Sequence, residues 1–224
     1  MTDAIGRIIA GDDPVFLLIA GPNGASKSTF TAKRLKPVGF PCIDPDKVAQ
    51  ELFGGHPTTA EQSRCATIES TLRVQERLRE RSSIALESVF SDIHGHKLSL
   101  LRDAHNAHFK TAIIFIGVDT PEICMARVQE RVEQGGHDVP DELIRSRFPR
   151  CFENLKAALE VVDLAILIDN SGGYGPSGLH EDGDRHYTFC VAERGKRAQI
   201  SQPLPHWFAE FGIAGALDRM AEAI

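Results

Sequence analysis

Short runs of apolar residues, bounded by polar stretches, are the clearest pattern along the chain. Residues 15–20, 111–118 and 164–168 are almost entirely apolar and have the length of buried strands. Two weaker runs, residues 41–43 and 84–86, each end directly before an acidic residue. The five runs predict the strands of a buried parallel sheet.

Helical patterns lie between these runs. We expect helices over residues 26–36, 60–81, 96–107, 121–134 and 143–159. Strands that alternate with helices predict an α/β fold, in which a parallel sheet is flanked by helices.

Two of the helices carry specific expectations. In residues 60–81, Cys65, Ile68 and Leu72 share one face, opposite a charged face. In residues 143–159, Pro149 predicts an interruption because proline has no N–H to donate within a helix.

The composition changes near residue 172. Residues 171–185 are rich in Gly, Asp and Ser and predict an exposed loop. Residues 187–192 predict an edge or hairpin strand, and Trp207 begins a terminal helix. We expect one domain over residues 1–171, with residues 172–224 packed on it as a small extension.

The bulk composition narrows the class of protein. The 224 residues are 42% hydrophobic and 25% charged, as in ordinary globular proteins. The formal net charge of −6 disfavours nucleic acid or an anionic membrane as a partner. No apolar run approaches the roughly 20 residues of a membrane span, and no secretory signal is visible. Five scattered cysteines without a C-x-x-C pair suit a reducing cytoplasm, where we expect the protein.

A phosphate-binding motif follows the first apolar run. Residues 21–28 read Gly-Pro-Asn-Gly-Ala-Ser-Lys-Ser, nearly the P-loop pattern G-x-x-x-x-G-K-[ST]. A strand, a glycine loop and a helix N-terminus together form an anion site, because the backbone N–H groups point inward and the helix dipole favours negative charge. Lys27 would reach the terminal phosphates, and the Ser28 hydroxyl would bind Mg²⁺. The candidate nucleotide-binding residues are Gly21, Pro22, Asn23, Gly24, Ala25, Ser26, Lys27, Ser28 and Thr29.

Ser26 departs from this motif, because it stands where the last glycine is expected. We expect Gly21 and Gly24 to make the tight turn. We expect Ser26 to keep a negative φ at the start of the helix, with its hydroxyl toward a phosphate. Crowding near the β-phosphate is the expected cost. The alternative for the whole motif is a structural glycine turn before a helix.

Acidic residues end two further strands. After residues 41–43, Asp44 or Asp46 could accept a proton from an attacking hydroxyl. The alternative is helix capping, which Asp44 fits well. Glu87 and Ser88 end the strand at residues 84–86. Glu87 could bind a substrate hydroxyl or a water on Mg²⁺, or form a salt bridge at the sheet edge.

An arginine-rich segment follows residues 111–118. Arg127 and Arg131 are four residues apart and share a helix face. A glycine-containing loop at residues 135–140 precedes Arg145, Arg147 and Arg150, which suggests a helical lid that closes over phosphates. A solvated charged face is the alternative for any single arginine.

The ordered set of motifs resembles the small zeta-toxin-like P-loop kinases, over roughly residues 14–171. The matching segments are residues 20–29, 43–46, 86–88, 121–122, 127–128, 131–132, 135–140 and 169–171.

The resemblance implies a kinase-type α/β fold, with an arginine-rich helical lid, that uses ATP and Mg²⁺. The best-known zeta toxins phosphorylate a sugar hydroxyl of UDP-N-acetylglucosamine, and an antitoxin protein blocks their nucleotide site. Asp46 matches the catalytic base of the family, and Arg131 matches the arginine that clamps the transferring phosphate.

The substrate side is matched less fully. Glu87 would help to hold the acceptor, together with Asp44 and Ser88. A second lid arginine of the longer toxins falls near His137, and Arg145 or Arg147 could take its place.

These observations leave three hypotheses about function. The first is an ATP-dependent kinase of a small-molecule hydroxyl. The second keeps the chemistry and changes the acceptor to a nucleoside, a polynucleotide end or an antibiotic. The third is a non-catalytic ATP-binding switch or scaffold. This hypothesis rests on Ser26, which departs from the P-loop motif.

Overall fold

A seven-stranded sheet forms the centre of the protein in the computed structural model, which describes residue 6 and residues 11–172 and 186–223. The strand order is β2-β3-β1-β4-β5-β6-β7. The strands are β1 (Val15–Ala20), β2 (Cys42–Ile43), β3 (Ile84–Ser88), β4 (Lys110–Gly117), β5 (Leu164–Asp169), β6 (Tyr187–Glu193) and β7 (Gln199–Ile200).

The first five strands are all parallel, and each predicted apolar run supplies one of them. β6 and β7 pair antiparallel at the other edge, so the run predicted at residues 187–192 is the inner strand of a hairpin. The predicted α/β fold with a mostly parallel sheet is confirmed. β1 lies between β3 and β4, the place in an open sheet where strand order reverses and ligands bind.

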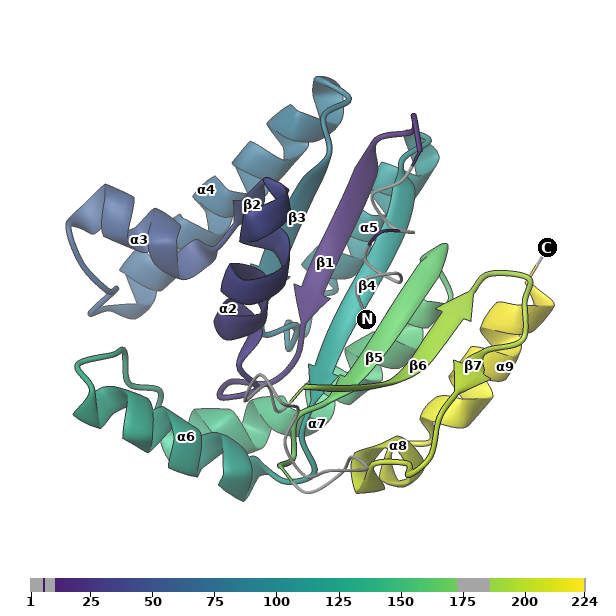
Figure 1. Cartoon of the computed structure of the whole chain (residues 1–224). Helices are drawn as coiled ribbons and strands as arrows, with labels where there is room; N and C mark the ends of the chain where they lie inside the picture. The colour runs from purple at the N-terminus through teal and green to yellow at the C-terminus, as the bar shows by residue number, and fades with distance from the viewer. Residues whose placement is uncertain (1–5, 7–10, 173–185, 224) are drawn as a thin grey trace.

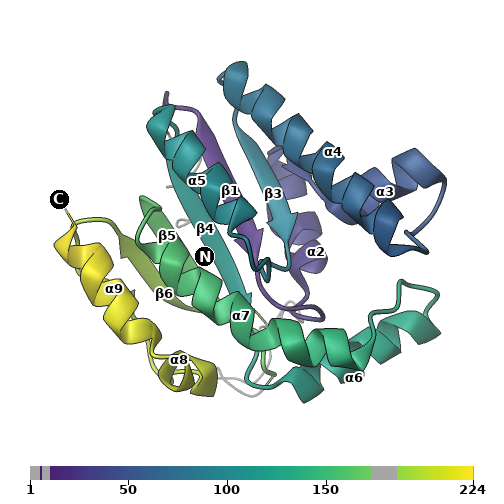
Figure 2. The same cartoon turned by 180° about the vertical axis from the view of Figure 1, so that it is seen from behind.

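Helices lie on both faces of the sheet, which explains why every residue of β1 and β5 is buried. The helices are α2 (Lys27–Phe30), α3 (Pro45–Phe53), α4 (Ala60–Arg79), α5 (His96–Asn106), α6 (Pro121–Glu133), α7 (Asp141–Leu159), α8 (His206–Glu210) and α9 (Ile213–Glu222). α5, α7 and α9 lie side by side over one face (Figure 2), and α2 lies on the opposite face (Figure 1). α6 crosses beyond the carboxyl ends of β1 and β4 (Figure 1).

Three helices differ from the sequence-based expectation. The helix after the P-loop is α-helical only over α2 and continues as a wider turn at Thr31–Leu35 and a 3₁₀ turn at Lys36–Val38. α7 runs through Pro149 without a break, because the core residues Phe148 and Phe152 on either side of it are buried and hold the helix in place. The terminal helix is divided at Gly212 into α8 and α9.

The face assigned to the helix at residues 60–81 is also wrong. Ile68 and Leu72 are 53% and 50% exposed, and Cys65 is exposed. The buried face of α4 instead carries Ala66, Ser70 and Val74. Small residues occupy that face because α4 packs closely on α3 and on the sheet edge, which leaves no room for longer side chains.

The C-terminal segment is anchored by Trp207, which is fully buried. Its Nε1 donates a hydrogen bond to Asp169 Oδ1 (2.9 Å), at the end of β5. A Cβ on Gly117 would lie 2.5 Å from the Trp207 ring, so the indole requires glycine at the end of β4. The loop predicted at residues 171–185 lies, from residue 173, outside the described residues. None of the described helices has the length and apolar character of a membrane span.

Candidate functional site

The loop after β1 has the shape of a phosphate-binding loop. Gly21 and Gly24 have φ of 146° and 73°, which favour glycine. A Cβ on Gly21 would lie 2.1 Å from Ile116 O, and one on Gly24 would lie 2.6 Å from Cys124 O. The expected role of both glycines in the turn is confirmed. Lys27 is buried, and its Nζ donates to the Pro22 carbonyl at 2.9 Å.

Ser26 does not take the expected negative φ. Its φ is 68° and its ψ is 33°, the left-handed conformation that glycine adopts easily. It precedes α2 without a side-chain capping hydrogen bond. The loop therefore keeps the conformation that the missing glycine would give, because burial of Ala25 and Lys27 on either side fixes the backbone there.

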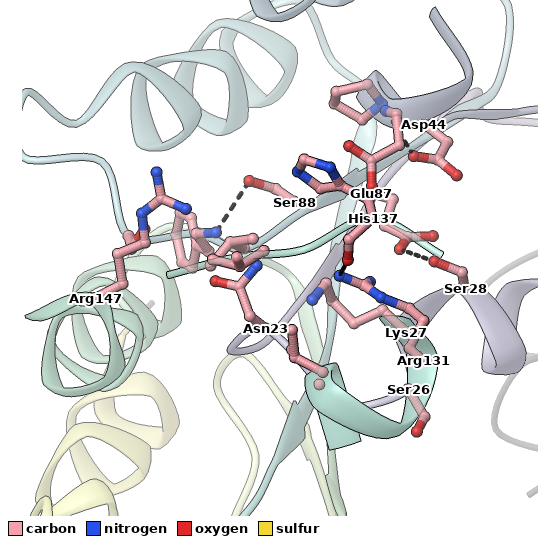
Figure 3. A pocket seen from close by; sticks show the side chains of 18 of the residues that line it. Asn23, Ser26, Lys27, Ser28, Asp44, Glu87, Ser88, Arg131, His137 and Arg147 are labelled. Carbon is pink, nitrogen blue, oxygen red and sulfur yellow. Dashed lines mark hydrogen bonds between the residues drawn. The ribbon is translucent and has the colours of Figure 1, made fainter. Parts of the chain in front are cut away.

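The loop is bonded directly to the acid that ends β3. Ser28 Oγ donates to Glu87 Oε1 at 2.6 Å (Figure 3). Thr31 Oγ1 donates to Glu87 Oε2 at 3.2 Å. Glu87 is 7% exposed. Burial raises the pKa of this carboxyl, although Lys27 and the two hydroxyls act in the opposite direction. Glu87 is thus a buried acid beside the phosphate loop, and it forms no salt bridge with any residue that the structure describes.

The two aspartates after β2 differ in environment. Asp44 is buried and caps α3, because its Oδ1 accepts from the backbone N–H of Asp46 at 3.0 Å. Lys47 Nζ lies 3.6 Å from its other oxygen. Asp46 is exposed and lines the same cleft as Lys27 and Glu87. The capping geometry expected for Asp44 is present, and it leaves Asp46 as the more accessible carboxylate.

The segment between α6 and α7 folds over this cleft. Arg131 donates to the backbone carbonyl of His137, and its buried Nε has no acceptor within the part of the chain that the structure describes. The His137 ring stacks on His56, from the connection between α3 and α4, with centroids 5.3 Å apart. Burial lowers the pKa of His137, while nearby Asp46 acts to raise it. The predicted lid therefore contacts the opposite wall, close to Asp46.

Arg127 of the predicted lid and Asn170, which follows the last parallel strand, tie the lid helix to the loop. Arg127 Nη2 donates to the Asn170 carbonyl at 2.7 Å. Asn170 Nδ2 donates to the Ala25 carbonyl at 3.0 Å, and its buried Oδ1 has no hydrogen-bond partner among the described residues. Both residues line the cleft. The position of Asn170 directly after the last parallel strand marks it in the sequence as a residue at the ligand-binding edge of the sheet.

One open cleft of about 990 Å³ lies at the carboxyl ends of the strands. Most of the predicted site residues line it: Asn23, Gly24, Ser26, Lys27, Ser28, Thr29, Asp44, Asp46, Glu87, Ser88, Arg131, His137 and Arg147. Arg145 does not, because it points out from α7 to an exposed ion pair with Glu122. Ser88 Oγ accepts from the Phe90 N–H at 3.0 Å and shapes the next loop. Gly21, Pro22 and Ala25 form the inner part of the P-loop, behind the cleft surface.

The donor set suits a hard divalent cation that arrives with a nucleotide. The Ser28 hydroxyl and the Glu87 and Asp44 carboxylates supply oxygens, which Mg²⁺ prefers. Within the described residues, no cluster of three His, Cys, Asp or Glu side chains forms a ready metal cage. A cation held by one or two protein oxygens together with phosphates is the usual arrangement for Mg²⁺, so the residues present fit it.

Comparison with solved structures gives the same fold. A chain of the AvrRxo1-ORF1:-ORF2 complex with ATP superposes with a TM-score of 0.62 and 17% identity, over 95% of this chain and 67% of that chain. In the form with sulphate ions, this chain spans 62% of the matched chain. The PezAT toxin-antitoxin system of Streptococcus pneumoniae gives a TM-score of 0.55 at 15% identity, over 75% of this chain and 72% of that chain.

A putative kinase from Chloroflexus aurantiacus J-10-fl gives a TM-score of 0.51 at 20% identity, over 61% of this chain and 80% of that chain. At such identities the likeness shows the fold alone, an α/β fold with a mostly parallel sheet flanked by helices. The sequence model of the AAA_33 family, described as an AAA domain, matches residues 16–151. Since this match covers more than half of the sequence, the chain belongs to the AAA domain family AAA_33.

Proposed function

We propose that the chain is an ATP- and Mg²⁺-dependent phosphotransferase that transfers the γ-phosphate to a hydroxyl of a small molecule in the cytoplasm. The observation that carries the proposal is the 2.6 Å hydrogen bond between Ser28 and Glu87. It joins the phosphate loop to a buried acid, in one cleft with Asp46 and the lid.

Lys27 and Arg131 supply positive charge for the transferred group. Both now donate to backbone carbonyls, of Pro22 and His137. A charge-assisted hydrogen bond to a phosphate oxygen is stronger than one to a neutral carbonyl, so nucleotide binding favours the exchange of partners. Ser28 and Glu87 would hold Mg²⁺, which neutralises charge on the phosphates when it is bound.

Asp46 is the proposed general base. It is the exposed carboxylate of the pair and lies under the lid at His137. Asp44 is engaged as a helix cap and positions the start of α3, so that Asp46 follows in the first turn. An acceptor hydroxyl between Asp46 and the terminal phosphate would lose its proton to this carboxylate as the new O–P bond forms.

The resemblance to zeta toxins makes UDP-N-acetylglucosamine the first acceptor to test, and an antitoxin protein the partner to seek. We would incubate the protein with γ-labelled ATP, Mg²⁺ and this sugar nucleotide, and in parallel with a bacterial metabolite extract. Asp46→Asn should lower label transfer by about 100-fold or more. Asp103→Asn is the control, because Asp103 is exposed on α5 and outside the cleft.

Each outcome decides between the hypotheses. Label on the sugar nucleotide supports the zeta-type acceptor, and label on another metabolite supports a kinase with a different one. Binding of ATP without any labelled product would overturn the enzyme in favour of a non-catalytic switch. Full transfer by Asp46→Asn would overturn the assignment of the base.

A further inference from the structure

Two arginines on α7, Arg147 and Arg150, line the cleft on the wall formed by the loop after β3. They are three residues apart and therefore share a helix face. That face is bonded to the loop, because Asn154 Nδ2 donates to the carbonyls of Phe90 (2.9 Å) and Asp92 (3.1 Å). The helix thus holds both guanidinium groups on a fixed wall.

Neither guanidinium group has a hydrogen bond or an ion pair with another described residue, and Arg150 Nε is buried without an acceptor. Burial and then the neighbouring Arg150 lower the pKa of Arg147. The two positive guanidinium groups are partly removed from water and repel each other. An anion bound between or beside them would offset this repulsion.

Other arginines on the helices are either bonded or exposed. Arg73 pairs with Glu69 and Glu51, and Arg145, only two residues from Arg147, pairs with Glu122. Three further arginines have no partner among the described residues but are exposed to water: Arg64, Arg79 and Arg102. Partial burial together with a missing partner therefore distinguishes the two arginines that face the cleft.

This wall is distinct from the nucleotide side of the cleft. In Figure 3, Arg147 lies across Asn23 and Ser88 from Lys27 and Ser28. Lys97, at the start of α5, also lines the cleft. Asp92 is an acid of the loop after β3, and its Oδ2 accepts from the Lys97 backbone N–H at 3.4 Å.

We propose that Arg147 and Arg150 bind a phosphate or pyrophosphate group of the acceptor, so that the acceptor is an already phosphorylated compound with a free hydroxyl directed to Asp46. Guanidinium forks match phosphate oxygens in geometry and charge. The inference rests on the proposed phosphotransferase function and specifies its substrate class.

The test uses the full chain with its P-loop saturated by the ATP analogue adenylyl imidodiphosphate and Mg²⁺. Inorganic pyrophosphate is then titrated in a calorimeter. We expect it to bind at a second site in the wild type, and Arg147→Met and Arg150→Met each to weaken that binding by about tenfold or more. Arg145→Met is the matched control on the same helix and should bind pyrophosphate like the wild type.

Binding of the analogue to each variant shows that it is folded and separates the possible failures. Analogue binding without a second pyrophosphate site would overturn the arginine site while the proposed function stands. An equal loss of analogue and pyrophosphate affinity in Arg147→Met and Arg150→Met would show that the arginines serve the nucleotide, which also overturns the inference. A wild type that binds no analogue would overturn the proposed function and, with it, the acceptor class.

Discussion

Ser26 takes a left-handed backbone conformation. This conformation lowers the stability of the folded state by roughly 1–2 kcal/mol for a residue with a side chain, and by little for glycine. A glycine at this position would offset part of the improvement, about 0.5–1 kcal/mol, because glycine has more conformational freedom in the unfolded chain. We therefore expect Ser26→Gly to stabilise the protein by up to about 1 kcal/mol in urea unfolding, without weaker ATP binding.

The control for Ser26→Gly is Ser99→Gly, in the exposed interior of α5, which should instead destabilise the protein by about 0.5–1 kcal/mol. Equal destabilisation by the two changes would show that Ser26 makes a contact that offsets its backbone strain.

Glu87 makes the stability of the folded protein depend on pH, because burial raises the pKa of its carboxyl group. Its contribution to the free energy of unfolding is therefore complete below the ordinary pKa of 4.5. That contribution is lost as the pH rises through the folded-state pKa. Glu87→Gln removes the buried charge. We expect the stability of this variant relative to wild type to increase between pH 4 and pH 7 in urea unfolding, while Mg²⁺-dependent transfer is lost.

Glu122 provides the opposite case. A bond to its own backbone N–H and then Arg145 lower its pKa, so its contribution is present above 4.5 and is lost as the pH falls. Glu122→Gln should therefore become slightly less stable relative to wild type as the pH rises. A parallel response of the two variants would contradict the environment that we describe for Glu87.

At the scale of elements, α8 is attached to the strand ends through Trp207. The indole packs with Phe115, Phe152 and Phe189 and bonds to Asp169. Trp207→Ala should cost about 3–5 kcal/mol. Trp207→Phe should cost about 1–3 kcal/mol, because the buried Asp169 loses a donor.

This pair of variants also tests whether residues 172–224 belong to the same folding unit, which stays a prediction. One unfolding transition, shifted as a whole by Trp207→Ala, is the expected result. Two separate transitions would contradict it. Ile200→Ala, on the exposed strand β7, is the control and should change stability by less than about 0.5 kcal/mol.

The sequence predicts most elements of the fold because the strands are continuous apolar runs and the P-loop has a local motif. Prediction from the sequence fails where tertiary packing determines which side chains are buried. Leu72 is apolar yet exposed, because α3 and the sheet edge select the small residues of α4. The sequence does not distinguish among Arg145, Arg147 and Arg150. Only the orientation of α7 in the structure shows that the last two face the cleft.

For the molecule as a whole, ATP should act as a stabilising ligand. At a concentration of about 100 times its Kd, a ligand that binds only the folded state adds about 2.7 kcal/mol. For a chain of this size, that raises the Tm by roughly 5–10 °C. We expect this shift with ATP and Mg²⁺ in thermal unfolding, because the P-loop bonds to Glu87 and, through Asn170 and Arg127, to the lid helix.

Two variants separate binding from catalysis in this measurement. Lys27→Met should abolish the ATP-dependent shift, since the cation that meets the phosphates is gone. Asp46→Asn should keep the full shift, because an exposed base on α3 contributes to transfer and little to nucleotide binding. If Asp46→Asn lost the shift together with transfer, Asp46 would belong to the nucleotide or Mg²⁺ site, and the acceptor hydroxyl would need a different base in the cleft, with Asp44 as the nearest candidate.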